Sequence, residues 1–305
     1  MKISPRCPAC LLNRAYTESK MATDDEEKIR KAVEESIKIL NRRYPLGEIN
    51  AAIATEMHRK VYEVLGVEDP YRKLKQRANE TVMRYLPEIR KFIEDQNDKF
   101  RASAIASIIG NTFDYGVMGH EVSENNFMDF FRKEFEKGLA IDDLNEIKEL
   151  CMGNVVYLTD NCGEIIVDDL FIENIKDISN HIAIVVRGKP ILSDATVEDA
   201  KLAGIDRIAD EVLTNGDGAI GIIEEELPPE TMERIKNADI IIAKGMANYE
   251  CLSDSELTVA FLLTAKCEPV AESLGVSVGD MVARLNGGKN ERIKRENFNR
   301  DVWSS

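Results

Sequence analysis

Two acidic residues and one amide lie where apolar runs of the sequence end abruptly. Asp160 and Asn161 directly follow the apolar run Val155–Thr159, and Asp194 lies in the polar stretch after a second run, His181–Val186. Carboxylate and amide oxygens are the ligands that Mg²⁺ and Mn²⁺ prefer. Three such ligands do not fill six coordination positions, so water or substrate oxygens must complete the shell. The residue types therefore predict an open divalent-cation site with Asp160 and Asp194 as its catalytic groups.

Cationic and glycine residues follow further apolar runs. Lys244 and Lys266 each end such a run, and Gly163 comes shortly after Asp160. Ammonium groups neutralise an anion, and glycine lets main-chain N–H groups approach it closely. A phosphate pocket beside a divalent cation suits hydrolysis of a phosphomonoester, because the ion polarises a phosphoryl oxygen and activates water. Asp160 or Asp194 could accept the proton of that water, or Asp160 could itself attack phosphorus.

Short β-branched runs alternate with helical segments after residue 150, which is typical of a mostly parallel sheet flanked by helices. The predicted strands are Val155–Thr159, His181–Val186, Arg207–Leu213, Ile240–Ala243 and Phe261–Ala265. The helical segments between them lie near Glu164–Asn174, Thr196–Ala203, Pro229–Asn237 and Glu250–Leu252. Ligands of such sheets bind beyond the carboxyl ends of the strands. We therefore expect the polar residues that follow these strands to meet.

The first half of the chain has a different pattern, with apolar residues recurring at three- and four-residue spacing, which predicts helices. The predicted helices are Asp24–Leu40, Leu46–Leu65, Asp69–Asp95, Asp98–Val117, Ser123–Lys137 and Asp142–Leu150. We predict a helical bundle domain at residues 1–150 and an α/β domain with the metal site at residues 151–285. Residues 286–305 are polar and are predicted to form a C-terminal tail, loose or docked.

Composition and charge restrict the possible partners. The chain has 305 residues, 44% of them apolar, which is enough for a substantial core. Its formal net charge of −15 repels nucleic-acid backbones and anionic membrane surfaces, so we expect neither as a partner. No apolar run is long enough to span a bilayer, and the opening residues lack the hydrophobic centre of a secretory signal. We expect a cytoplasmic protein that acts on a small phosphorylated metabolite; the number of subunits does not follow from the sequence.

Four ordered segments, DNCGEI (160–165), RGKPILSDATVEDA (187–200), KGMANYE (244–250) and LLTAKCEPVA (262–271), resemble the metal-dependent damage-control phosphatase family, first catalogued as domain of unknown function 89. The segment CPAC at residues 7–10 is similar to the archaeal and bacterial branch of that family. The resemblance implies a helical domain on a Rossmann-like, three-layer α/β domain. It also implies hydrolysis of phosphomonoesters of sugars or cofactor-related metabolites with Mn²⁺, Co²⁺, Ni²⁺ or Mg²⁺.

The resemblance also assigns roles to individual residues. It implies that Asp160, Asn161 and Asp194 bind the metal ion. The positions that contact substrate in the family correspond here to Glu164, to Met246–Glu250 with Asn248 at its centre and Tyr249 beside it, and to Lys266.

Structural interpretations compete with these roles. Asp160 and Asn161 could form a turn that caps the next helix, and Asp194 is well placed to cap the helix near Thr196–Ala203. Cys7 and Cys10 could be accessory thiols that bind a metal or form a redox pair, or simply small side chains at a helix start. Arg187 and Lys189 are expected to be structural or peripheral.

Two other functions remain as alternatives to a phosphatase. The same acids and glycines would suit a metal- or nucleotide-binding module without turnover, although no GxxxxGK[ST] segment and no strand-linked GxGxxG segment is present. The second alternative is a methyltransferase that acts on protein carboxylates, for which the sequence shows no distinct adenosylmethionine motif.

Overall fold

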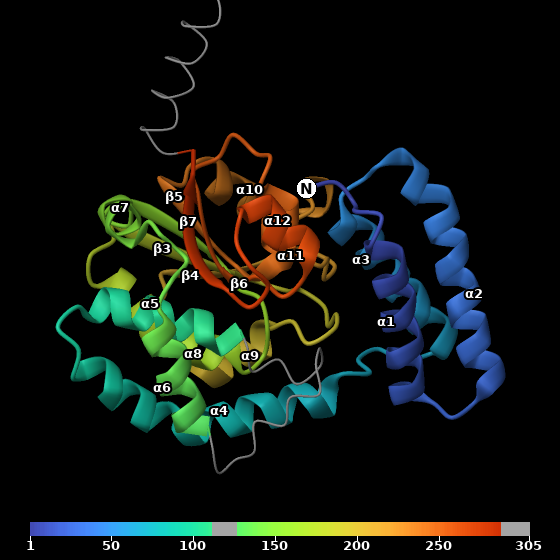
Figure 1. Cartoon of the computed structure of the whole chain (residues 1–305), viewed down its shortest axis with the longest axis horizontal. Coiled ribbons are helices and arrows are strands. Elements are labelled where there is room, and N and C mark those ends of the chain that lie inside the picture. The colour runs from blue at the N-terminus through green and yellow to red at the C-terminus, as the bar shows by residue number, and fades with distance from the viewer. Residues whose placement is uncertain (112–126, 288–305) are drawn as a thin grey trace, which may run out of the picture.

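The computed structural model describes residues 1–111 and 127–287 (Figure 1). In this part of the chain a seven-stranded sheet has the order β1-β7-β6-β5-β2-β3-β4. The strands are Ile141–Asp142 (β1), Asn154–Leu158 (β2), His181–Val186 (β3), Glu211–Thr214 (β4), Ile240–Lys244 (β5), Val259–Thr264 (β6) and Met281–Asn286 (β7). All neighbouring strands are parallel except β6 and β7. The predicted α/β fold with a mostly parallel sheet is therefore confirmed.

Both faces of the sheet are apolar and both are covered by helices, because successive residues of a strand point to opposite faces. Val155 and Tyr157 of β2 belong to one apolar cluster, whereas Val156 and Leu158 belong to another. The first cluster is covered by Arg72–Glu94 (α4), Lys99–Gly110 (α5), Phe127–Lys137 (α6), Leu144–Leu150 (α7), Glu164–Lys176 (α8) and Val197–Ala203 (α9). The second is covered by Pro229–Lys236 (α10), Gly245–Leu252 (α11) and Glu268–Leu274 (α12). The result is a three-layer arrangement.

Three further helices form a separate group beside the sheet, at the right of Figure 1: Cys7–Ala22 (α1), Glu26–Arg43 (α2) and Asn50–Leu65 (α3). Helix α2 begins where the Asp25 carboxylate accepts hydrogen bonds from the N–H groups of Glu27 and Lys28. Helix α4 extends from this group to the layer beneath the sheet. The first apolar cluster contains residues from both sides of position 150, and the division into domains at that position stays a prediction.

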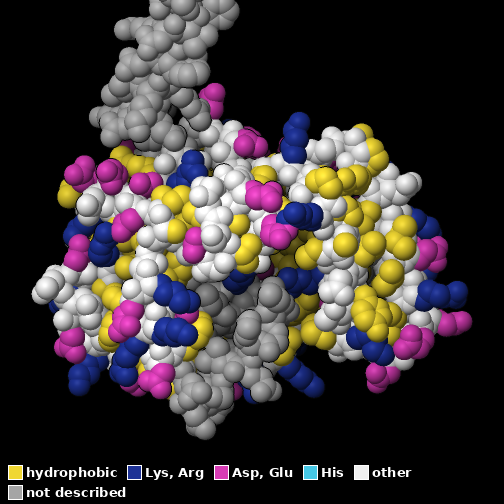
Figure 2. All heavy atoms as spheres, viewed as in Figure 1, with side chains coloured by type: hydrophobic (Ala, Val, Ile, Leu, Met, Phe, Trp, Pro, Cys, Tyr) yellow, Lys and Arg dark blue, Asp and Glu magenta, His cyan; other side chains and the backbone are white. Residues whose placement is uncertain are grey.

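The surface seen in Figure 2 has acidic and basic side chains interspersed, with hydrophobic side chains between them over α1 and α2. None of the helices in the described ranges is long and apolar enough to cross a membrane.

Several predicted boundaries are wrong. The predicted strand Arg207–Leu213 starts too early. Its first residue, Arg207, is the last residue of the 3₁₀ turn Ile205–Arg207, and β4 starts only at Glu211. Strands β1 and β7 and helix α12 were not predicted, and Asn286, assigned to the tail, is the last residue of β7. Parts of two predicted helices, 98–117 and 123–137, and nearly all of the predicted tail lie outside the described residues.

Candidate active site

Polar side chains from three adjacent strands meet at one end of the sheet. Asp160 follows β2, Arg187 follows β3 and Lys244 ends β5, and in the sheet β2 lies between β5 and β3. The chain proceeds from β2 to β3 and β4 on one side and places β5 and β6 on the other. The strand order therefore reverses beside β2, and α/β proteins bind their ligands at the carboxyl ends of the strands where such a reversal occurs.

The two loops that carry the predicted metal ligands are joined through their main chains. Asn161 and Asp194 form an antiparallel bridge. The N–H of Cys162 donates to the carbonyl of Ser193 at 2.8 Å, and the N–H of Ala195 donates to the carbonyl of Asp160 at 2.8 Å. The loops therefore lie side by side and bring the Asp160 and Asp194 side chains together, with exposed fractions of only 8% and 4%.

Neither aspartate caps a helix, so the capping interpretation is wrong. Helix α9 is capped by Thr196, whose side chain and main chain form a reciprocal pair with Asp199. Helix α8 begins after Gly163 without a side-chain cap. The two carboxylates instead accept hydrogen bonds from other side chains of the site.

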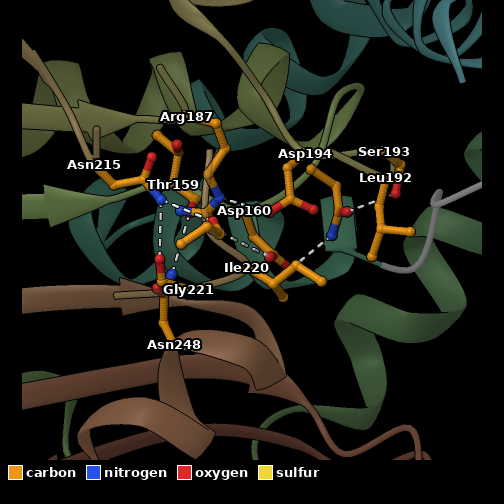
Figure 3. A network of polar contacts seen from close by, with 12 residues as sticks. Thr159, Asp160, Arg187, Leu192, Ser193, Asp194, Asn215, Ile220, Gly221 and Asn248 are labelled. Atoms are coloured by element: carbon orange, nitrogen blue, oxygen red, sulfur yellow. Dashed lines mark hydrogen bonds and ion pairs between the residues drawn. The ribbon is translucent and has the colours of Figure 1, made fainter. Parts of the chain in front are cut away.

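Arg187 is fully buried between these carboxylates (Figure 3). Its Nε donates to Asp194 Oδ2 at 2.6 Å, and its Nη2 lies 3.8 Å from Asp160 Oδ1. The sequence predicted Arg187 to be structural or peripheral, and its full burial shows that the peripheral alternative is wrong. Lys189, by contrast, is exposed and pairs with exposed Asp217. The signal that distinguishes Arg187 is its place directly after a buried strand, the same place that Asp160 has after β2.

The Asp160 carboxylate receives hydrogen bonds from two amides. Its Oδ2 accepts from Nδ2 of Asn111 at 3.0 Å and from Nδ2 of Asn161 at 2.6 Å. Burial raises the pKa of Asp160 well above its usual range, and the charges of Glu164 and Asp194 raise it further, against the opposing effect of Arg187 and Lys266. Burial and the neighbouring carboxylates thus disfavour the charged form of Asp160.

Lys244 and Glu164 form a buried ion pair behind Asp160, and neither side chain is exposed. The Lys244 ammonium group donates to Glu164 Oε1 at 2.7 Å, to Asp168 Oδ1 at 2.6 Å and to the carbonyl of Ser107 at 3.2 Å. Burial alone would lower the pKa of Lys244, but the charges of Asp168 and Glu164 outweigh it and raise that pKa. All three N–H bonds of the predicted phosphate-binding lysine are thus directed at protein oxygens.

Glu164 connects this ion pair to the predicted metal ligands. Its Oε2 accepts from the main-chain N–H of Asn161 at 3.2 Å and from Nδ2 of Asn111 at 2.7 Å. Asn111 caps the end of α5, a helix that approaches α8 closely because Gly110 has no side chain to separate them. Asn111 was not predicted, since its helix lies far from the site in the sequence.

The remaining predicted substrate residues occupy different surroundings. Asn248 donates from Nδ2 to the carbonyls of Thr159 at 3.2 Å and Lys244 at 2.8 Å, and Lys266 Nζ donates to the carbonyl of Asn111. Tyr249 packs in the second apolar cluster, with its hydroxyl 2.8 Å from Ser273 Oγ.

The N–H of Gly163, predicted to approach an anion, donates to the Oδ1 of Asn79 in α4 at 2.6 Å. Asn79 in turn donates to Asp199 at 2.8 Å, so helix α4 holds the first turn of α8 and the start of α9 in place. A phosphate role for Gly163, and substrate contacts for Glu164, Lys244 and Tyr249, remain predictions.

The accessory thiols lie at the start of α1, where Cys7 is half-buried and Cys10 is exposed. Burial raises the pKa of Cys7, which disfavours the reactive thiolate. Among the described residues, no group of three or more His, Cys, Asp or Glu side chains could hold a metal ion. The predicted ligand set Asp160, Asn161 and Asp194 is not such a group, because it has only two carboxylates and its third member is an amide.

Comparisons with known proteins agree with one another. A family model described as "Damage-control phosphatase ARMT1-like domain" matches residues 3–282. A relative from Archaeoglobus fulgidus named "Damage-control phosphatase" is 57% identical over 93% of this chain and 99% of its own length, and an uncharacterised protein from Methanocaldococcus jannaschii is 37% identical over 92% and 95%. The crystal structure of a DUF89 family protein from Pyrococcus horikoshii has a TM-score of 0.85 at 33% identity, covering 94% of this chain and 99% of that one.

Proposed function

The chain belongs to the damage-control phosphatase family, and we propose that it is a metal-dependent phosphatase that hydrolyses phosphomonoesters of small metabolites. Sugar phosphates and damaged, cofactor-related metabolites are the proposed substrate class. The observation that supports this most directly concerns two loops that are joined through their main chains. Each loop carries one buried aspartate, Asp160 or Asp194, and neither aspartate caps a helix.

The donor set suits a divalent cation. Among the described residues of the site, carboxylates outnumber cations: the carboxylates are Asp160, Glu164, Asp168 and Asp194, and the cations are Arg187, Lys244 and Lys266. With all seven groups charged, the net charge of these side chains is −1, and a bound divalent cation would change it to +1. That charge attracts a phosphomonoester dianion, so the charges of the site support an ion and its anionic substrate together.

Asn161 can serve as a ligand through its amide oxygen. Its Nδ2 now faces Asp160, and its Oδ1 accepts from the hydroxyl of Ser193 at 2.9 Å. A half-turn of the amide keeps the Ser193 contact, because a hydroxyl accepts as well as donates, and points Oδ1 towards Asp160. Mn²⁺, Co²⁺, Ni²⁺ and Mg²⁺ are the ions we propose for this site.

Different residues of the chain would then bind the ion, accept a proton and position the carboxylate. A divalent cation held by Asp160, Asn161 and Asp194 would supply polarisation of a phosphoryl oxygen and a bound water of lowered pKa. Asp160 and Asp194 are the two groups that we propose to take the proton of the attacking water. The amide of Asn111 orients the Asp160 carboxylate, and the buried Lys244–Glu164 pair holds that amide and the main chain of Asn161 in place.

The test begins with protein stripped of metal by a chelator. Mn²⁺, Co²⁺, Ni²⁺ and Mg²⁺ are added back separately, and release of inorganic phosphate is measured from a generic aryl phosphate and a panel of sugar phosphates. We expect at least one ion to restore turnover and Asp160→Asn to abolish it. The exposed Asp217 pairs with Lys189 and provides the matched control, Asp217→Asn, which should leave turnover unchanged.

Two results would contradict the proposal. Folded protein that releases no phosphate with any of the ions would favour a binding module without turnover. Full activity in Asp160→Asn would place the chemistry elsewhere in the molecule.

A further inference from the structure

Arg187 carries buried hydrogen-bond donors that nothing in the described chain satisfies. Among the described residues it is the largest fully buried side chain, and of its three side-chain nitrogens only Nε donates a hydrogen bond to them. Its Nη1 and Nη2 have no hydrogen-bond partner among the described residues. A buried charged donor without a partner is costly, so a native protein retains one only where a ligand, ion or water completes it.

The ion pair with Asp194 does not explain why Nη1 and Nη2 of Arg187 lack hydrogen-bond partners among the described residues. An arginine that serves only as a counter-ion usually engages a carboxylate through two parallel N–H bonds. Here Arg187 reaches Asp194 through Nε alone, and its Nη2 is 3.8 Å from Asp160 Oδ1, beyond hydrogen-bond distance. The outer edge of the guanidinium group, which is the edge that matches two oxygens of a phosphate, makes no hydrogen bond to the described residues although it is buried.

The other buried cation at the site cannot take this role. The three N–H bonds of Lys244 are directed at Glu164, Asp168 and the carbonyl of Ser107. A phosphate could recruit Lys244 only by breaking one of these fully buried contacts. Arg187 can donate two hydrogen bonds without breaking any.

A second unsatisfied atom lies on the other side of β2. Asn248 is fully buried, and its Nδ2 bonds two carbonyls, those of Thr159 and Lys244, so the amide cannot turn without facing Oδ1 towards both oxygens. Its Oδ1 has no partner among the described residues. Arg187 follows β3 and Asn248 lies in the helix after β5, so the open donors and the open acceptor flank the strand that leads to Asp160 (Figure 3).

We propose that Arg187 is the phosphate-binding residue of this site and donates from Nη1 and Nη2 to two phosphoryl oxygens. The bond from Nε to Asp194 fixes the plane of the guanidinium group. One residue therefore links a predicted metal ligand to the anion. The identity of the anion rests on the proposed function.

Inorganic phosphate is the probe, titrated by calorimetry into the full-length protein at constant ionic strength, with and without Mn²⁺. We expect the wild type to bind phosphate saturably. Arg187→Lys keeps the charge but loses the paired donors and should bind about 10-fold more weakly, and Arg187→Met about 100-fold more weakly. Lys189→Met, two residues away and exposed, should bind like the wild type.

Kinetics supply a second readout. For a phosphomonoester substrate, Arg187→Lys should raise KM and weaken product inhibition by phosphate about 10-fold each, whereas a residue that only supports the fold would lower kcat or the amount of folded protein. Far-UV circular dichroism checks the fold of each variant, and if Arg187→Met does not fold, Arg187→Lys decides.

The outcomes separate this inference from the proposed function. Phosphate binding of unchanged strength in Arg187→Lys, or no saturable binding in the wild type, would overturn the assignment even in an active phosphatase. Binding that depends on Arg187 in a protein without turnover would support the anion site and refute the phosphatase.

Discussion

Replacing Lys244 by methionine tests whether the buried ion pairs beside Asp160 stabilise the folded protein. Lys244, Glu164 and Asp168 are all fully buried, so the substitution leaves two carboxylates in the protein interior without their cation. Removing one partner of a buried ion pair costs about 3–5 kcal/mol. We expect the free energy of unfolding of Lys244→Met at pH 8 to fall by that amount.

The loss should depend on pH, with a sign that follows from Asp168. Burial raises the pKa of Asp168 from 3.8 to about 6, although Lys244 lowers it by its charge and its hydrogen bond. A carboxyl group with a raised pKa in the folded state gives stability that is fully present below pH 3.8 and is lost as the pH rises through 6. Without Lys244 the pKa of Asp168 rises further, so the carboxyl is neutral at pH 5. The deficit of the variant should therefore be smaller at pH 5 than at pH 8.

Urea unfolding followed by far-UV circular dichroism at the two pH values measures both effects. Adding Asp168→Asn to Lys244→Met should recover part of the loss at pH 8, because one unpaired carboxylate is removed. Exposed Lys189→Met is the control for loss of a lysine and should unfold at the wild-type urea concentration. A variant as stable as the wild type at pH 8, or equally destabilised at both pH values, would refute this account of the ion pair.

Two further substitutions test local features of the site and its surroundings. Gly245 has φ +74° and a Cβ there would overlap the Asp160 carboxylate, so Gly245→Ala should abolish phosphatase activity and lower the melting temperature. Gly275→Ala, at φ +75° with nothing within 4 Å, should show only the backbone cost of about 1–2 kcal/mol and keep activity; equal effects of the two would contradict the steric argument. Burial raises the pKa of Glu250 from 4.5 to about 7, so the stability that its neutral form provides is lost as the pH rises through 7. The free energy of unfolding of Glu250→Gln should therefore exceed that of the wild type by up to about 3 kcal/mol at pH 8, but not at pH 4. Thermal unfolding at both pH values measures this gain, and a gain that is absent at pH 8 or independent of pH would contradict the prediction.

Local sequence patterns predicted the central strands well, because each of them is buried on both faces and reads as a continuous apolar run. Strands β2, β3, β5 and β6 were placed within two residues of their observed bounds. Strand β7 was missed because its sequence, MVARLN, mixes apolar and polar residues and its last three side chains are partly exposed. Strand β1 has only two residues and pairs with β7, so it has no periodicity to detect.

The candidate site was predictable only where its residues follow strands. Asp160, Asp194, Lys244 and Lys266 were found by reading what comes after each apolar run. Residues contributed by the helical half carry no such signal. Asn79 and Asn111 are polar residues on or at the end of helices, and nothing nearby in the sequence distinguishes them from solvent-exposed amides. Their roles depend on the packing of α4 and α5 against α8, which a periodicity analysis does not give.

The charges at the site also explain why amide hydrogen bonds and buried ion pairs surround its carboxylates. In the described part of the chain, four acidic side chains lie close together where water has little access, and three cationic side chains there do not balance their charge. Such a cluster opposes folding, and a purely structural core would replace it with apolar residues at no loss of stability. Its retention, together with open donors on Arg187 and an open acceptor on Asn248, points to ligands that complete the site. The amides of the helical half and the Lys244 ion pairs hold the cluster in place until those ligands bind.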